Sequence, residues 1–284
     1  MSKQTGAAMW LASYPKSGNT WVRMFLASYL CGGIEIDPNN LPRDLTYADG
    51  REWDYHQVSP YPINALGSVE ILMLRQAAFL SIISRSTSRP ILIKTHCANA
   101  ILDDVRLFLP QVTKGAIHIV RDPRDVLTSF AKWQGVPVDQ ALENMLTEQT
   151  MIPGMRETSK TLFQYLGRWD KHVASWMDNS SFPVTTVRYE DLLGEPRREA
   201  KRIIEGIGWT YDEDRAARAL SHVSFGKMKA FEEKHGFREK PKEVDHPFFR
   251  EGKIGGWRDF LTPEQSGRVE TEFRETMTVL GYEL

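Results

Sequence analysis

Three things are scarce in this sequence, and each scarcity excludes a class of protein. Only two of the 284 residues are cysteines, Cys31 and Cys97, which excludes a disulfide framework and a cysteine-based zinc site. No apolar run is long enough to span a membrane, and the best candidate, ILMLRQAAFLSIISR at 71–85, contains Arg75. The net charge is −1, so no basic field indicates nucleic acid or an anionic membrane as a partner. We therefore expect a cytoplasmic protein that binds neither of these.

What the sequence does contain is an alternation of strand-like and helix-like segments. Short apolar runs each precede a segment with helical spacing. The strands are expected at 9–14, 90–95, 115–121 and 182–190, and the helices are expected to begin near Asn19, Asp103, Pro123 and Pro196. This order predicts an α/β fold with a central parallel sheet flanked by helices on both faces. In such sheets, ligands bind at the carboxyl ends of the strands.

We expect a single domain over residues 1–284, because the sequence contains no recognisable domain linker and no internal repeat. Two segments, 32–65 and 234–257, fit the alternation poorly, because they are rich in turn formers or in mixed charge. Long segments of this kind inside a compact domain are usually functional loops. Near the C-terminus, Thr262 is typical of a helix start, and this last helix is expected to end near Gly281.

The turn YPKSGNT, residues 14–20, carries the clearest chemical signal. It joins the first strand to the first helix, whose free N–H groups and positive dipole end suit a phosphate. Lys16 adds a cation, and Gly18 lets the backbone approach an anion closely. Ser17 and Thr20 add hydroxyl donors. The nucleoside-triphosphate pattern GxxxxGK[ST] is absent, so the turn predicts an anion site of another kind. The alternative is an ordinary turn with a surface lysine.

At YPKSGNTW the sequence resembles the 5′-phosphosulfate loop of the soluble sulfotransferases, whose sulfuryl donor is 3′-phosphoadenosine 5′-phosphosulfate (PAPS). The resemblance implies a P-loop-type three-layer sandwich with PAPS as co-substrate. It also implies that the donor is bound by the residues of this loop, namely Lys16, Ser17, Gly18, Asn19, Thr20 and Trp21.

A second motif, IVRDPRDVLTSF at 119–130, resembles the 3′-phosphate site of the family. It places the arginine of that site on Arg121 and the serine on Ser129. A guanidinium fork and a hydroxyl are groups that bind phosphate well. For Arg124 and Asp125 in the same motif, we expect exposed ion pairs.

Further segments resemble nucleotide-binding parts of the family, in the order that the family has them. They imply PAPS contacts from Tyr189 in VRYEDL, from Ser224 and Phe225 in HVSFGKM, and from Arg250, Glu251 and Gly252 in FFREGKIGGW. Glu251 stands where the family has a lysine, so only its backbone N–H could serve. The resemblance also implies acceptor-site loops at about 32–65 and 134–157, and a nucleotide-binding loop at about 234–258. Aromatic residues in regions that line the acceptor pocket of relatives, with packing as the alternative, are Trp53, Tyr55, Tyr61, Phe130 and Trp133.

The motif KTH at 94–96 resembles the catalytic motif of the family and places the general base on His96. A histidine titrates near neutral pH, so it can accept a hydroxyl proton without a permanent charge. A structural histidine is the alternative. By the same resemblance, Lys94 and Lys16 stabilise the transferring group, with Lys16 at the oxygen that bridges sulfate and 5′-phosphate. We expect no metal, because no strand ends in a Mg²⁺ aspartate unless Asp122 or Asp191 serves.

Together the motifs predict a sulfotransferase that moves a sulfuryl group from PAPS to a hydroxyl of a small-molecule acceptor. The products would be a sulfate ester and adenosine 3′,5′-bisphosphate. The alternatives are a P-loop small-molecule kinase and a catalytically inactive nucleotide-binding relative. The acceptor loops carry no transferable code, so phenols, steroids, sugars and lipid alcohols stay open. A homodimer is also left open, because the dimer motif K-x-x-x-T-V-x-x-x-E of many relatives is degenerate here, with Arg258, Thr262 and Gly267 at its positions.

Overall fold

The computed structural model describes most of the chain. The described residues are 7–41, 47–85, 90–152, 162, 164–240, 247–249 and 252–284. Arg250 and Glu251, expected at the nucleotide site, lie outside the described residues.

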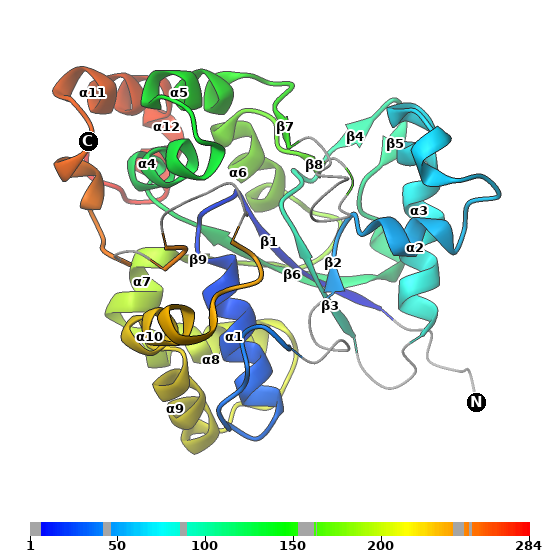
Figure 1. Cartoon of the computed structure of the whole chain (residues 1–284), viewed down its shortest axis with the longest axis horizontal. Coiled ribbons are helices and arrows are strands. Elements are labelled where there is room, and N and C mark those ends of the chain that lie inside the picture. Colours follow the sequence, from blue (N-terminus) through cyan, green and yellow to red (C-terminus); the bar gives the residue numbers. More distant parts are fainter. Residues whose placement is uncertain are drawn as a thin grey trace.

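A parallel sheet runs through the centre of the molecule (Figure 1). Within the described residues its strand order is β2-β3-β1-β6-β9, and every neighbouring pair is parallel. The strands are β1 (Ala8–Ser13), β2 (Tyr47–Ala48), β3 (Ile91–Thr95), β6 (Thr113–Val120) and β9 (Val184–Arg188). Two antiparallel ribbons pair β4 (Ile101–Leu102) with β5 (Val105–Arg106), and β7 (Met151–Ile152) with β8 (Gln164–Tyr165). The predicted central parallel sheet is confirmed.

Helices cover both faces of this sheet (Figure 1). The helices are α1 (Asn19–Leu30), α2 (Glu52–His56), α3 (Ser68–Ser84), α4 (Pro123–Gln134), α5 (Val138–Leu146), α6 (Trp169–Met177), α7 (Tyr189–Gly194), α8 (Pro196–Gly206), α9 (Glu213–His222), α10 (Phe225–His235), α11 (Pro263–Glu272) and α12 (Arg274–Val279). Short 3₁₀ turns lie at Ile63–Ala65, Pro110–Val112 and Gly256–Asp259. The predicted helix starts at Asn19, Pro123 and Pro196 are confirmed.

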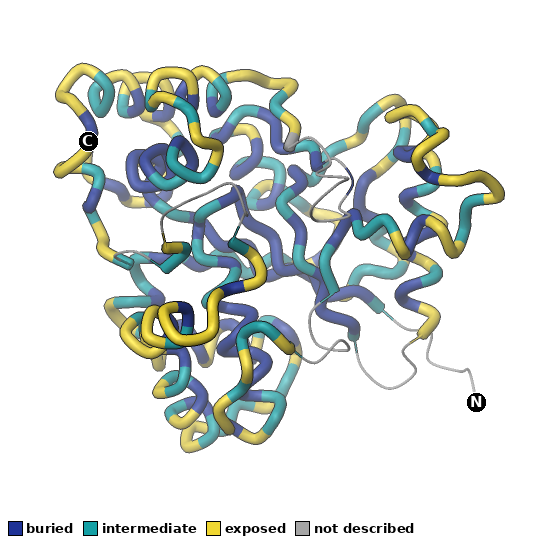
Figure 2. Tube along the Cα trace, in the orientation of Figure 1, coloured by how far each residue is buried: buried dark blue, intermediate teal, exposed yellow. Residues whose placement is uncertain are grey.

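Alternation along β1 divides the core into layers. Met9 and Leu11 point to a face that packs against α1, α8 and α9. Trp10 points to the opposite face, where its ring meets those of Phe79 from α3 and Phe108 at centroid distances of 5.0 and 4.7 Å. The inner strands β1 and β3 and most of β6 are accordingly buried, the edge strands β2 and β9 are mostly half-buried, and exposed residues gather on the outer helices (Figure 2). This is the predicted three-layer α/β arrangement.

The helix expected near Asp103 is not there. The chain forms the β4–β5 hairpin instead, with Asp103 and Asp104 as its two-residue turn at φ of 45° and 63°. Two-residue hairpin turns favour positive φ at both central positions, and aspartate tolerates that conformation. The helix associated with β3 is α3, which lies before the strand in sequence.

The C-terminal helix begins as predicted but is not continuous. Thr262 caps α11 through a reciprocal capping box with Gln265. The helix then breaks at Phe273, whose φ of −113° is not helical and whose ring packs at 5.0 Å from Trp169. The second part, α12, ends shortly before Gly281. The predicted single helix is therefore two helices, which meet at this buried aromatic residue.

Candidate active site

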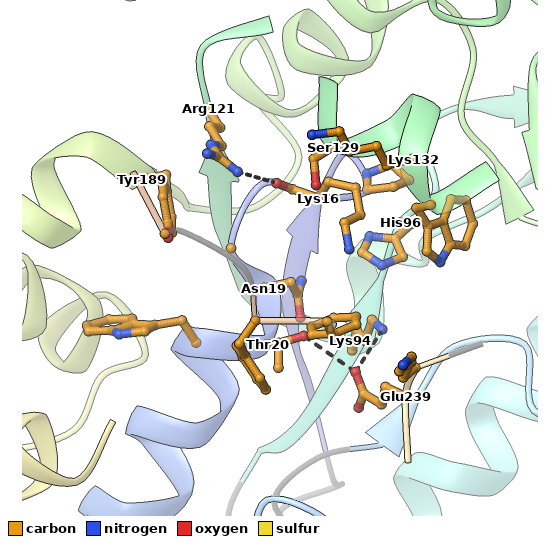
Figure 3. A pocket seen from close by; sticks show the side chains of 18 of the residues that line it. Lys16, Asn19, Thr20, Lys94, His96, Arg121, Ser129, Lys132, Tyr189 and Glu239 are labelled. Carbon is orange, nitrogen blue, oxygen red and sulfur yellow. Dashed lines mark hydrogen bonds and ion pairs between the residues drawn. The ribbon is translucent and has the colours of Figure 1, made fainter. Parts of the chain in front are cut away.

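A cavity of about 680 Å³ opens at the carboxyl ends of β1, β3 and β6, beside the first turn of α1 (Figure 3). This is the edge at which ligands bind in open parallel sheets. Most of the residues predicted for the site lie together in its wall. They are Lys16, Gly18, Asn19, Thr20, Trp21, Lys94, His96, Arg121, Ser129, Tyr189, Phe225 and Gly252.

The turn between β1 and α1 is shaped to present backbone N–H groups. Lys16 and Gly18 have φ of 68° and 102°, which lets the chain reverse within a few residues. Gly18 is the N-cap of α1, no side chain caps this helix start, and its first turn contains no acidic residue. The Ser17 hydroxyl is buried without a hydrogen-bond partner among the described residues. Uncapped N–H groups and an unsatisfied hydroxyl at a helix N-terminus suit an anion.

Gly18 must be a glycine for a second reason. A Cβ atom at this position would lie 2.4 Å from Cδ2 of Tyr189. The guanidinium of Arg121 lies over the same ring, with its central carbon 4.6 Å from the ring centroid. The phosphate turn, Tyr189 and Arg121 therefore form one packed unit, although they come from three distant parts of the sequence.

Arg121 joins the turn to the C-terminal loop. Its Nη1 donates to the carbonyl of Lys16 at 3.2 Å, and its Nη2 donates to the carbonyl of Lys253 at 3.3 Å. Its Nε is buried and has no partner among the described residues. Ser129 lines the same cavity. An arginine with an unsatisfied buried N–H and a serine, both at one cavity, suit a phosphate.

The prediction of exposed ion pairs at Arg124 and Asp125 is wrong. Both residues are buried, with exposed fractions of 3% and 2%. Arg124 pairs with Asp122 at 2.7 Å and with Glu270 at 2.6 Å. The Asp125 carboxylate accepts the backbone N–H groups of Gly255 and Trp257, each at 2.9 Å. Asp125 thus fastens the C-terminal loop to α4, because two amides of that loop need a buried acceptor.

His96 follows β3 directly, and its geometry defines which ring nitrogen is available. Its Nδ1 lies 2.8 Å from the carbonyl oxygen of Ser13. A carbonyl oxygen can only accept, so Nδ1 carries the proton and Nε2 keeps its lone pair. Burial, together with the nearby charge of Lys94, lowers the pKa of His96 well below 6.5. The ring is therefore neutral at neutral pH and can accept a proton.

Lys94 lies on β3, close to His96, and reaches into the same cavity (Figure 3). Its Nζ is 3.9 Å from a carboxylate oxygen of Glu239. Burial lowers the pKa of the Lys94 ammonium, while the Glu239 charge opposes that effect. The ammonium of Lys16 lies over the ring of Phe248, 4.2 Å from its centroid. Two lysines and a neutral histidine thus surround one space.

Several predicted residues do not line this cavity. Ser17 is buried within the turn, and Ser224 is exposed at the start of α10. Phe225, next to Ser224, does reach the wall, and its ring contacts the backbone of Gly252. A Cβ atom on Gly252 would lie 2.3 Å from the Phe225 ring, so this close approach requires a glycine there.

Among the aromatic residues considered for the acceptor, only Trp133 lines the cavity. Tyr55 and Phe130 belong to the core, with exposed fractions of 3% and 0%. Trp53 and Tyr61 are exposed on the surface. The packing alternative therefore holds for the two core residues.

Sequence reasoning missed Glu239 and Arg23, which pair at 2.6 Å at the edge of the site. No local signal points to them, because Glu239 lies in a segment of mixed charge and Arg23 lies inside a helix. In the part of the chain that the structure describes, no group of three or more histidine, cysteine, aspartate or glutamate side chains is arranged to hold a metal ion. None of the described helices is long and apolar enough to cross a membrane.

Comparison with known proteins agrees with this geometry. Residues 7–281 match the family described as the sulfotransferase domain. Sulfotransferase 1A1 of Rattus norvegicus is 27% identical over 283 residues, covering 94% of this chain and 84% of the relative. Cytosolic sulfotransferase 16 of Arabidopsis thaliana is 26% identical over 291 residues, covering 94% and 76%.

The fold is similar to that of solved structures. A crystal structure of retinol dehydratase in complex with androsterone and the inactive cofactor PAP has a TM-score of 0.60, at 19% identity, covering 98% of this chain and 82% of that one. Mouse sulfotransferase SULT7A1 complexed with PAP has a TM-score of 0.58, at 21% identity, covering 95% and 84%. The chain belongs to the sulfotransferase family, and it is an enzyme of the sulfotransferase class. The resemblance seen in the sequence is confirmed.

Proposed function

We propose that this enzyme transfers a sulfuryl group from PAPS to a hydroxyl of a small-molecule acceptor. The observation that carries the proposal is the shared cavity. A neutral histidine and two lysines lie in the same wall as the Arg121 and Ser129 pair. The first set suits the transfer of an anionic group, and the second suits the 3′-phosphate that distinguishes PAPS from other adenine nucleotides.

The nucleotide is held at two ends in this proposal. The 5′-phosphosulfate lies on the turn before α1, where Ser17 and Gly18 precede the helix and Asn19 and Thr20 form its first turn. The 3′-phosphate lies against Arg121 and Ser129. The adenine lies near Tyr189, Trp21 and Phe225, whose rings border the cavity. Gly252 keeps the C-terminal loop close to Phe225. Donor contacts from Arg250 and Glu251, which lie outside the described residues, are proposed from the family resemblance alone.

His96 serves as the general base. Its Nε2 accepts the proton of the acceptor hydroxyl while the oxygen attacks sulfur. As the new O–S bond forms, the bond from sulfur to the bridging oxygen breaks. The electron pair stays on the 5′-phosphate of the leaving adenosine 3′,5′-bisphosphate. Lys16 offsets the charge that develops on this bridging oxygen, and Lys94 offsets charge on the transferring group.

Family membership favours this function over the kinase alternative. The inactive-relative alternative would need the base or the cations to be lost, whereas Lys16, Lys94 and His96 are all present. The transferred sulfuryl carries less charge than a terminal phosphoryl, so the proposed reaction needs no divalent metal.

The organisation of the whole chain is part of the proposal. We propose one domain over 1–284, with acceptor loops at about 32–65 and 134–157 and a nucleotide loop at about 234–258. Trp133 and Gln164 in the cavity wall support an acceptor site on that side. The name of the Arabidopsis relative, a cytosolic sulfotransferase, supports a cytoplasmic location. A homodimer, where it forms, would lack the usual motif, since Arg258 and Gly267 replace its lysine and glutamate.

The proposal is tested by calorimetry with three nucleotides. Adenosine 3′,5′-bisphosphate should bind much more tightly than ADP or ATP, because only the bisphosphate has a 3′-phosphate for Arg121. Arg121→Ala should weaken bisphosphate binding by roughly 2–4 kcal/mol, since the Arg121 side chain is mostly buried and would make charged hydrogen bonds to the phosphate there. Equal affinity for ADP and the bisphosphate would contradict the proposal.

A further inference from the structure

Glu239 is an acidic residue in a site that must receive a strongly anionic donor. One oxygen of its carboxylate lies 2.6 Å from Nη1 of Arg23. The other accepts the Thr20 hydroxyl at 3.4 Å and lies 3.9 Å from Nζ of Lys94 (Figure 3). Arg23 and Thr20 belong to α1, and Lys94 belongs to β3. The carboxylate thus bridges the phosphate-binding helix and the strand that leads to His96.

The backbone around Glu239 is fixed by contacts that do not involve its charge. Asn39 donates from Nδ2 to the carbonyl of Gly236 at 3.0 Å and accepts the N–H of Arg238 at 2.8 Å. The ring of Phe237 packs at 4.8 and 5.0 Å from the rings of Phe248 and Phe249. Hydrogen bonds and aromatic packing therefore fix the backbone conformation of residues 236–240. The ion pairs of Glu239 follow from that placement.

The charges around Lys94 show what the carboxylate does there. Arg23 and His96 face the Lys94 ammonium from α1 and from the end of β3, and within the part of the chain that the structure describes Glu239 is the anion that acts on it. Burial and the Arg23 charge lower the pKa of Lys94, and Glu239 raises it. Burial acts to raise the pKa of Glu239 itself, but the charges of Lys94 and Arg23 outweigh it and hold that pKa at about 2. Glu239 is therefore ionised throughout the neutral range.

The position of Glu239 is also compatible with an anionic donor. Its side chain is about one-third exposed, at 33%, and faces the cavity. The positive charges of the Arg23 guanidinium at 2.6 Å and the Lys94 ammonium at 3.9 Å offset the carboxylate charge, so its repulsion of a phosphosulfate is weak. The looser of the two pairs is the one with Lys94. That ammonium has three N–H donors, so it can keep one toward Glu239 while another reaches a donor oxygen.

We propose that Glu239 is a positioning residue for sulfuryl transfer, which holds the Lys94 ammonium charged and directed into the cavity beside His96. This inference rests on the proposed function, because it takes Lys94 as a group that stabilises the transferring sulfuryl. Glu239 touches neither donor nor acceptor in this role. Its contribution reaches the reaction through the charge state of Lys94.

The test is a pH profile of kcat/KM for PAPS with an aliphatic alcohol acceptor, which does not ionise in the range. In Glu239→Gln, Lys94 should lose its proton at lower pH, so the alkaline limb moves to lower pH. At the acidic end the variant should be at least as active as wild type, because Glu239 also raises the pKa of His96 and its removal lowers that pKa. At the alkaline end it should be about tenfold slower, the size expected for removal of an opposite charge at this distance. In Glu239→Asp, which keeps the negative charge, the alkaline limb should lie between those of Glu239→Gln and wild type.

Glu233→Gln is the matched control. Glu233 lies on α10, is exposed, and pairs with Lys229 at 4.0 Å, so its substitution removes the same charge outside the cavity. Its profile should coincide with wild type. Lys94→Arg provides a second variant that keeps Glu239 intact. A guanidinium stays charged at high pH, so the alkaline limb of this variant should move to higher pH.

Three results would overturn the inference. One is a Glu239→Gln profile whose alkaline limb coincides with wild type. Another is a Lys94→Arg profile with an unmoved limb, which would mean that Lys94 does not set it. The third is tighter bisphosphate binding and faster turnover of Glu239→Gln at every pH, which would make the carboxylate a competitor of the donor. A wild-type enzyme that forms no sulfate ester at any pH would instead contradict the proposed function.

Discussion

His96 and Lys16 line one cavity but have different tasks, and substitution should separate them. His96→Ala should keep its nucleotide affinity while kcat falls by ~10²–10⁴-fold, the usual contribution of a positioned base. An acidic acceptor such as a nitrophenol should be affected less than an aliphatic alcohol, because it needs less help to lose its proton. Lys16→Ala should slow every acceptor alike and weaken PAPS binding, since charge on the bridging oxygen develops whatever the acceptor.

The measurement is kcat against acceptor pKa for wild type and both variants. His56→Ala serves as a control, because His56 is exposed and lies outside the cavity wall. A near-normal kcat of His96→Ala on an unactivated alcohol would place the base on another residue.

The acid limb of the pH profile follows from the environment of His96. Burial and the Lys94 charge lower the pKa of His96 well below 6.5, so the reactive neutral form persists into mildly acidic solution. Activity should therefore stay level as pH falls through 6.5 and decline only below it. The check is kcat/KM between neutral and acidic pH. A decline centred at 6.5 or above would show that the base is more exposed than the structure has it.

At the scale of the element, the C-terminal loop depends on Asp125 of α4. Asp125→Asn keeps the shape but offers one acceptor oxygen where Gly255 and Trp257 present two N–H groups. Loss of one such buried bond costs about 1–3 kcal/mol, so bisphosphate affinity should fall by roughly tenfold or more. Calorimetry measures this loss, and Asp214→Asn on an exposed turn of α9 is the control. Unchanged affinity would mean that the loop does not contribute to binding.

The elements that sequence reasoning located are those whose pattern is local. The apolar run of β1 and the turn at Lys16 and Gly18 mark a strand, a reversal and a helix start without reference to the rest of the chain. Asp103 was misjudged because a helix and a two-residue hairpin turn both admit polar residues. Phe273, where the C-terminal helix breaks, contacts Trp169, a residue more than one hundred positions away. Tertiary contacts of this kind produce no recognisable pattern in the local sequence.

At the scale of the whole molecule, the same contrast explains how much of the site could be predicted. Lys16, His96 and Arg121 stand in ordered motifs, and the parallel sheet brings their strand ends to one edge. The burial of Asp125 could not be predicted, because its partners are amides of a distant loop. Nor could the place of Glu239, which depends on packing of residues 236–240 against Asn39 and two phenylalanines. The motifs were enough to predict the catalytic and phosphate-binding residues, but they could not predict which charged residues pair across the fold.

The central claim is that this chain moves a sulfuryl group from PAPS to a hydroxyl without a metal. The most direct measurement incubates the purified enzyme with ³⁵S-labelled PAPS and a panel of phenols and alcohols, in the presence of EDTA, with His96→Ala alongside. We predict that label appears in a sulfate ester of at least one acceptor and that EDTA leaves the rate of transfer unchanged. The rate of transfer by His96→Ala should be a small fraction of the wild-type rate. Transfer that stops with EDTA and returns only with Mg²⁺, or no transfer to any hydroxyl by an enzyme that binds the bisphosphate, would contradict the account.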